Sequence, residues 1–203
     1  MTLIPDPWLF DSTVADVYEQ HVHQHIPLYE ETINFCLDYA QLHLASDAKI
    51  LDFGCATGCT LRKLHKLGFE NLWGVDTSPQ MYQPWDDGVI HYSTTLVNQP
   101  YDLILCNWTL HFNETKWSIL DNLHRLSTRL IVSDKTKETL ERQAEYEQWK
   151  MAQGVSLTEV LAKNKSLKGL MHLDWVGDYC ANSPYSSQIV HSQLGFYTLL
   201  FEQ

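Results

Sequence analysis

The chain has 203 residues, 44% of them hydrophobic, which is enough for one well-buried domain and too few for two of full size. Its 14 Lys and Arg against 25 Asp and Glu give a net charge of −11, which argues against direct binding of nucleic acid through its phosphates. No apolar run of about 18 residues occurs, and the opening "MTLIPDPWLFD" lacks the basic start and apolar centre of a signal peptide, so we expect a cytoplasmic protein without a membrane segment.

The predicted elements begin with a helical region. Residues 12–44 carry apolar side chains at helical spacing, interrupted at Pro27. Strand-like and helix-like stretches then alternate, which is typical of a parallel sheet covered by helices. The expected strands are 49–53, 71–76, 89–92, 101–107 and 129–134, and the expected helices are 60–67, 78–83 and 114–126.

The last third of the chain has a different pattern. Helices are expected at about 136–152 and 156–165, a loop at 175–185, and two strands that turn at "SQLG". The fold class is therefore α/β, with a Rossmann-like, doubly wound, mostly parallel sheet, an antiparallel C-terminal hairpin and an N-terminal helical lid. We expect a single domain, in which 1–46 form the lid, 47–134 the cofactor-binding core, and 135–203 the substrate and dimer helices and the hairpin.

The stretch "KILDFGCATGCTLRKL" places Gly54, Ala56 and Gly58 between a strand and a helix. In doubly wound sheets, ligands bind beyond the carboxyl ends of the strands, where such a turn offers bare backbone and a helix N-terminus. Asp76 ends the next strand about 20 residues later, where a carboxylate can accept hydrogen bonds from ribose hydroxyls. The pattern predicts an adenosine-bearing ligand. The alternative is that the glycines only form the turn and that Asp76 caps a helix near Ser78.

Three motifs carry a family resemblance, namely "ILDFGCATG", "LWGVDTSPQM" and "YDLILCNWTLHF". Together they resemble motifs of the class I S-adenosylmethionine-dependent methyltransferases over residues 49–134. The resemblance implies S-adenosyl-L-methionine as the cofactor and places Asp52 near its methionine end. Ala56 stands where glycine is usual, and its methyl group should narrow the approach to the ligand.

A closer resemblance covers nearly the whole chain. The stretches "WLFDSTVADVYEQHVHQHIPLYEETI", "LCNWTLHF" and "YEQWKMAQGVSLTEVLAKNKSLKGLM" are similar to the carboxy-S-adenosylmethionine synthases of the tRNA wobble-uridine oxyacetate pathway. That family is dimeric, and the resemblance implies a possible homodimer here. With the first motif, it implies these cofactor-binding residues: Tyr29, Asp52, Gly54, Cys55, Ala56, Gly58, Asp76, Thr77 and Asn107.

Two features of that closer family are missing. The stretch "HYSTTLV" has no acidic residue, and residues 175–187 contain no Arg or Lys that could hold a transferred carboxylate. A carboxylate beside a sulfonium requires a cationic partner, and guanidinium supplies the best one. We therefore favour a methyltransferase acting on a small molecule. The alternatives are a carboxy-S-adenosylmethionine synthase that uses prephenate and a non-catalytic nucleoside-binding paralogue.

The candidate catalytic residues are His111 and Tyr29. His111 can act as a base near neutral pH, or it can be a helix-start histidine with a surface partner. The candidate substrate residues are Trp108, which either stacks on a planar substrate or packs under the lid, and Tyr185, which could reach the site of a second copy.

Two further patterns invite other interpretations. His21 and His25 of "HVHQH" are spaced to share one helix face, but no Cys or acidic partner stands at a recognisable ligand spacing, so no metal is expected. Cys55 and Cys59 are expected to be packed thiols.

Overall fold

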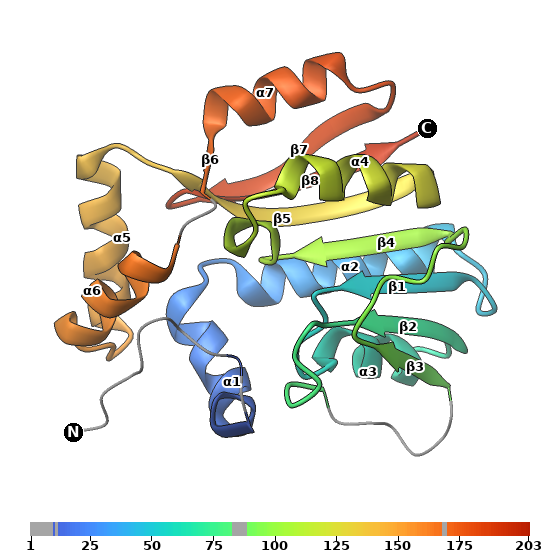
Figure 1. The fold of residues 1–203 in the computed structure, drawn as a ribbon, viewed down its shortest axis with the longest axis horizontal. Helices are drawn as coiled ribbons and strands as arrows, with labels where there is room; N and C mark the ends of the chain where they lie inside the picture. The colour runs from blue at the N-terminus through green and yellow to red at the C-terminus, as the bar shows by residue number, and fades with distance from the viewer. Residues whose placement is uncertain (1–9, 11, 83–88, 168–169) are drawn as a thin grey trace.

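The computed structural model describes residues 10, 12–82, 89–167 and 170–203, and it is built around one sheet (Figure 1). The strand order is β3-β2-β1-β4-β5-β8-β7. The first five strands in this order are parallel, and β8 runs antiparallel to both β5 and β7. The expected fold class, a mostly parallel Rossmann-like sheet with an antiparallel C-terminal hairpin, is confirmed. The strands are β1 (Lys49–Phe53), β2 (Asn71–Val75), β3 (Ile90–Ser93), β4 (Leu103–Asn107), β5 (Arg129–Lys137), β6 (Met171–His172), β7 (Ser186–Gln193) and β8 (Phe196–Glu202).

Helices cover both faces of the sheet. Helices α2 and α3 pack on one face, and α4 and α7 pack on the other. Helices α1, α5 and α6 gather beyond one end of the sheet (Figure 1). None of the described helices is long and apolar enough to cross a membrane. The helices are α1 (Ser12–His25), α2 (Tyr29–His43), α3 (Cys59–Lys66), the 3-10 turn η1 (Leu110–Phe112), α4 (Lys116–Leu126), α5 (Leu140–Ala152), α6 (Leu157–Ser166) and α7 (Leu173–Asn182).

The strands alternate their side chains between two cores. Leu51 and Ile104 contribute to the core under α4 and α7, whereas Ile50 and Leu103 contribute to the core under α2 and α3. All four side chains are fully buried, as expected for parallel strands that are covered on both faces. This double burial fixes the strands rigidly and leaves the loops at their ends available for binding.

Two predicted elements differ from the structure. The helix expected at 78–83 is a turn in its described part, residues 78–82, because one bond from Met81 N–H to the Ser78 carbonyl is not extended into a helical ladder. Residue 83 lies outside the described residues. The loop expected at 175–185 is mostly helix α7, in which Val176 and Tyr179 pack at helical spacing against the sheet.

The loop between β1 and α3 has an unusual backbone. Gly54 (φ +80°), Ala56 (φ +45°) and Gly58 (φ +75°) all adopt left-handed conformations. The N–H groups of Gly54 and Cys55 both bond to the carbonyl of Val75 at the end of β2, at 2.7 and 3.0 Å. The loop is therefore held tightly against the neighbouring strand end, and two of its three left-handed positions carry glycine, which adopts this backbone without strain.

We predict that Gly54→Ala destabilises this loop far more than Gly68→Ala destabilises the end of α3. Both glycines have positive φ, but a Cβ at Gly54 would lie 1.9 Å from Thr109 Oγ1, whereas nothing lies within 4 Å of a Cβ at Gly68. The control should cost about 1–2 kcal/mol of unfolding free energy from backbone strain alone. Urea unfolding measures both variants, and equal losses would show that the approach of Thr109 does not matter.

Candidate functional site

The carboxyl ends of β1, β2 and β4 surround a cavity of about 260 Å³. A smaller cavity of about 30 Å³ adjoins it and shares Tyr18 and Trp108 as walls. We call the two together the cofactor cleft. All nine predicted cofactor-binding residues except Gly58 line it: Tyr29, Asp52, Gly54, Cys55, Ala56, Asp76, Thr77 and Asn107.

Asp76 anchors the glycine loop from the end of β2. One carboxylate oxygen accepts a hydrogen bond from Ala56 N–H at 2.9 Å, and the other accepts one from Ser78 N–H at 2.9 Å. Burial raises the pKa of this carboxyl group. The alternative that Asp76 caps a helix near Ser78 is therefore correct in part. Asp76 does accept a hydrogen bond from Ser78 N–H, but the residues that follow form a turn and not a helix. Each carboxylate oxygen still has a lone pair for a ligand hydroxyl.

Two buried acceptors lie deeper in the cleft. Asn107 Oδ1 is buried and has no hydrogen-bond partner within the described part of the chain, while its amide nitrogen contacts Cys36 Sγ at 3.7 Å. Asp52 is 4% exposed, and burial followed by the charge of Asp76 raises its pKa to about 7. An unsatisfied buried amide oxygen next to a buried carboxyl group favours a ligand with a cationic donor, such as the ammonium group of an amino acid.

Tyr29 and Trp108 form one wall of the cleft. Their rings stack with centroids 4.9 Å apart, and both side chains are buried. Burial raises the pKa of Tyr29 well above its ordinary value, so its hydroxyl group stays protonated and does not act as a base near neutral pH. Trp108 has φ +53°, an unfavourable conformation for a side chain of this size, and its ring packs on Tyr29 of the lid.

A second cavity of about 90 Å³ lies on the other side of Trp108. We call it the lysine cavity because Lys135, Lys150 and Lys163 line it. It shares Phe10, Tyr18, Trp108 and Phe112 with the cofactor cleft, so the two spaces are neighbours across one aromatic wall. These three lysines come from three separate elements, β5, α5 and α6.

His111 faces the lysine cavity and has a buried carboxylate partner. Its Nδ1 pairs with one oxygen of Asp134, and its backbone N–H donates to the other oxygen at 3.0 Å. Asp134 is fully buried in β5. The expected alternative of a surface partner for His111 is therefore wrong. The pairing leaves Nε2 as the ring nitrogen that can accept a proton.

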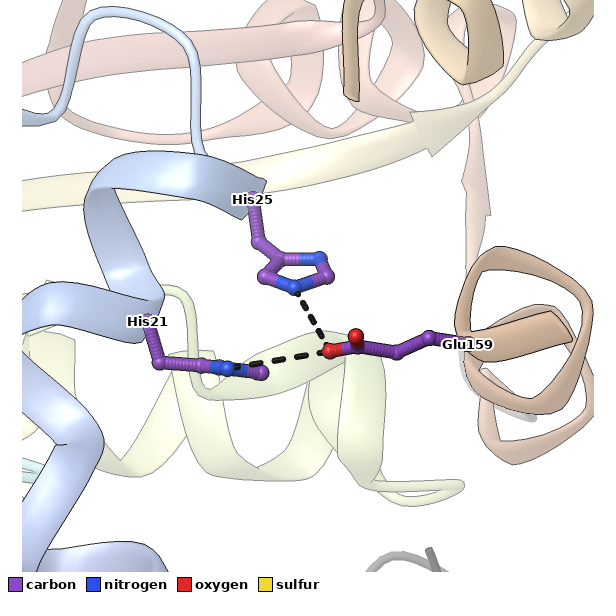
Figure 2. Close-up of side chains that lie close together, drawn as sticks. All are labelled: His21, His25 and Glu159. Carbon is purple, nitrogen blue, oxygen red and sulfur yellow. Dashed lines mark hydrogen bonds and ion pairs between the residues drawn. The ribbon is translucent and has the colours of Figure 1, made fainter. Parts of the chain in front are cut away.

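The structure adds a carboxylate to the two histidines of α1. His21 and His25 point toward Glu159 of α6 (Figure 2), with His25 Nε2 at 3.2 Å and His21 Nδ1 at 3.8 Å from the same oxygen. These residue types can bind a metal ion. However, the ammonium group of Lys163 contacts the other nitrogen of His21, and positive charge at that position opposes a cation. The absence of a metal stays a prediction.

The remaining site residues lie elsewhere or inside the core. Tyr185 precedes β7 at the amino end of β5, where its ring stacks on His124 and its hydroxyl donates to the His124 carbonyl at 2.7 Å. Within one chain it therefore does not reach the cleft, since the cleft lies at the carboxyl ends. Cys55 is a buried thiol, as expected, whereas Cys59 is half-buried at the start of α3. Gly58 faces Tyr92.

Residues 20–171 match the methyltransferase-domain family. Carboxy-S-adenosyl-L-methionine synthases from Campylobacter fetus subsp. fetus and Campylobacter hominis are each 28% identical over 184 and 185 residues, covering 80% of this chain and 78% of the relative. The plantazolicin methyltransferase BpumL in complex with SAH has a TM-score of 0.68 at 14% identity, over 95% of this chain and 88% of that chain. The magnesium protoporphyrin IX methyltransferase ChlM from Synechocystis PCC 6803 with bound SAH has a TM-score of 0.66 at 15% identity, over 96% of both chains.

The two structural similarities, at these identities, establish the fold, and the family match includes most residues that line the cofactor cleft and the lysine cavity. The expected class of enzyme and its cofactor, S-adenosyl-L-methionine, are confirmed. The chain belongs to the methyltransferase-domain family.

Proposed function

We propose that this chain transfers the methyl group of S-adenosylmethionine to a small molecule that enters through the lysine cavity. The observation that carries the proposal is the arrangement of the two spaces, which share an aromatic wall at Trp108 and Phe112. One space offers bare loop backbone and buried acceptors, and the other offers a histidine paired with a carboxylate. A two-substrate transfer needs such neighbouring spaces.

The residues of the cleft fit the cofactor in chemical type. The backbone of Gly54 and Ala56 would lie against it, and Asp76 would accept hydrogen bonds from its ribose hydroxyls. Asn107 and Asp52 would receive its ammonium group, because one is an unsatisfied acceptor and the other a buried acid. Tyr29 and Thr77 would close the cleft from the lid and from the β2 loop.

The sulfonium of S-adenosylmethionine supplies an already activated methyl group, so the chain has to align the acceptor and exclude water. Trp108, which is buried, and Tyr18 of the helical lid serve those two needs, since both line the cofactor cleft and the lysine cavity. His111 would accept the proton that the acceptor loses, at its Nε2. The carboxylate of Asp134 holds the ring orientation and stabilises the imidazolium that forms.

One observation supports the second candidate, a carboxy-S-adenosylmethionine synthase. Residues 175–187 contain no Arg or Lys, but the lysine cavity supplies three ammonium groups from other elements. A transferred carboxylate would therefore not lack a cationic partner. Mass spectrometry of the ligand that copurifies with the protein separates the two candidates, because a carboxylated adduct would favour the synthase and its place in tRNA modification.

We expect Asp76→Ala to weaken S-adenosylmethionine binding by about 1–3 kcal/mol, since ribose hydroxyls would lose their acceptor. Calorimetry measures this change. Asp102→Ala is the matched control, because Asp102 also accepts from a backbone N–H, that of Lys49 at 2.7 Å, but at the amino ends of the strands. If both variants bind the cofactor equally well, Asp76 has only its capping role.

His111→Asn should lower kcat about 10²–10⁴-fold with an acceptor that must lose a proton, while the cofactor affinity stays unchanged. Asparagine keeps a polar group near Asp134 but cannot accept the proton. Steady-state kinetics with the acceptor and calorimetry with the cofactor test the two parts. Unchanged kcat would leave His111 a positioning residue for the loop after β4.

We also propose that the chain is cytoplasmic and forms a homodimer in which Tyr185 and α7 of one copy approach the other. The pocket beside Tyr185 is formed by Trp117, Tyr179 and neighbouring residues and has a volume of about 540 Å³, which supports a contact surface there. Light scattering at micromolar concentration should give twice the mass of the chain. A monomer would remove any role for Tyr185 in a neighbouring site.

A further inference from the structure

The lysine cavity contains buried positive charge that is not fully neutralised. Lys135 is 2% exposed and Lys150 is 1% exposed, which is rare for lysine. Among the described residues, no carboxylate oxygen lies within 4.0 Å of either ammonium group. In that part of the chain, the ammonium group of Lys135 donates one hydrogen bond, to Gln143 Oε1 at 3.3 Å.

Aromatic faces compensate for part of this charge. The ammonium of Lys135 lies 4.1 Å from the ring centroid of Tyr146, and that of Lys150 lies 4.5 Å from the same centroid. These rings stabilise the two cations in part by cation–π attraction, but they carry no net negative charge. Burying two ammonium groups on this support destabilises the folded chain unless an anion joins them.

Lys163 adds a third cationic group to the same cavity. Its ammonium contacts Nε2 of His21, and Glu159 lies against His21 and His25. Burial and the neighbouring lysines lower the pKa of His21 to about 3 and keep His25 neutral as well. With the histidines neutral, three lysines and no carboxylate line the cavity among the described residues, and the carboxylates of Glu138, Glu147 and Glu159 act on these lysines without lining it.

We propose that Lys135, Lys150 and Lys163 bind the anionic group of the acceptor, so that the second substrate is a small organic anion with an apolar body. This proposal rests on the proposed function for the role of the ligand as acceptor. The apolar body would pack on Trp108, Tyr146 and Phe196, which line the same cavity. Its volume of about 90 Å³ is several times the roughly 10–15 Å³ that one water molecule needs.

The pKa shifts of the lysines supply a second readout. Burial, followed by the other lysine charge, lowers the pKa of Lys135 to about 8, and burial lowers that of Lys150 to about 8 and that of Lys163 to about 7. Glu138, Glu147 and Glu159 act in the opposite direction. A bound anion favours the charged lysines, so binding at pH 8 should take up protons, whereas binding at pH 6 should not, because the lysines are then already charged.

The experiment is calorimetric titration of the whole protein with benzoate, phenyl phosphate and benzamide, in Tris and in triethanolamine buffer. We expect benzoate or phenyl phosphate to bind at least tenfold more tightly than the uncharged benzamide, with proton uptake at pH 8. The tighter of the two anions identifies the group as carboxylate or phosphate. Equal binding of all three probes would overturn the proposal.

Lys150→Met is the informative variant, and Lys137→Met is its control because Lys137 lies on the same strand as Lys135 but is exposed. Lys150→Met should lose at least tenfold in anion affinity and, below pH 8, should unfold at a higher temperature because a buried charge is removed. Lys137→Met should change neither. Equal anion affinity in the two variants would overturn the proposal. Lys163→Gln repeats the test if Lys150→Met does not fold.

The same titrations with S-adenosylmethionine separate this proposal from the proposed function. Binding of the anion without binding of the cofactor would leave the anion site standing and remove the transferase role. Binding of the cofactor with no preference for anions would leave the transferase role standing and remove the anion site.

Discussion

The parallel pairing of β1 with β2 on one side and β4 on the other is the constraint on which the site depends. Asp52 of β1 lies opposite Gly74 of β2 and Leu105 of β4. The carboxyl ends of the three parallel strands therefore lie side by side. Both faces of these strands are buried under helices, which prevents a shift in register. The glycine loop, Asp76 and Asn107 are adjacent as a result.

Trp108 separates the space beyond these strand ends into two chemically different parts, the cofactor cleft and the lysine cavity. On one side are acceptors, namely carboxyl groups and an unsatisfied amide oxygen, which suit a cationic ligand. On the other side are ammonium groups and aromatic rings, which suit an anion. The positive φ of Trp108 is a strained conformation, and the surrounding burial maintains it. Opposite charge preferences on the two sides of one ring would orient two substrates relative to each other.

Sequence periodicity predicted the regular elements well where apolar patterning was strong. The bounds of β1 and the break at Pro27 agree with the structure. Helix α7, which contains Gly177 and ends shortly before Pro184, was predicted as a loop, and the helix near Ser78 was predicted from a cap that closes only a turn. For helix α7, contacts of Val176 and Tyr179 with the sheet stabilise a helix that local propensity did not indicate.

The sequence by itself determined the family, the fold class and the cofactor cleft, because those depend on short motifs at strand ends that lie in fixed chain order. Only the tertiary structure decided the partner of His111, the position of Tyr185 and the lysine cavity. Asp134 lies 23 positions from His111, and the three lysines come from β5, α5 and α6. A short sequence motif cannot reveal such residues, because they come together only where separate elements pack beyond the carboxyl ends of the strands.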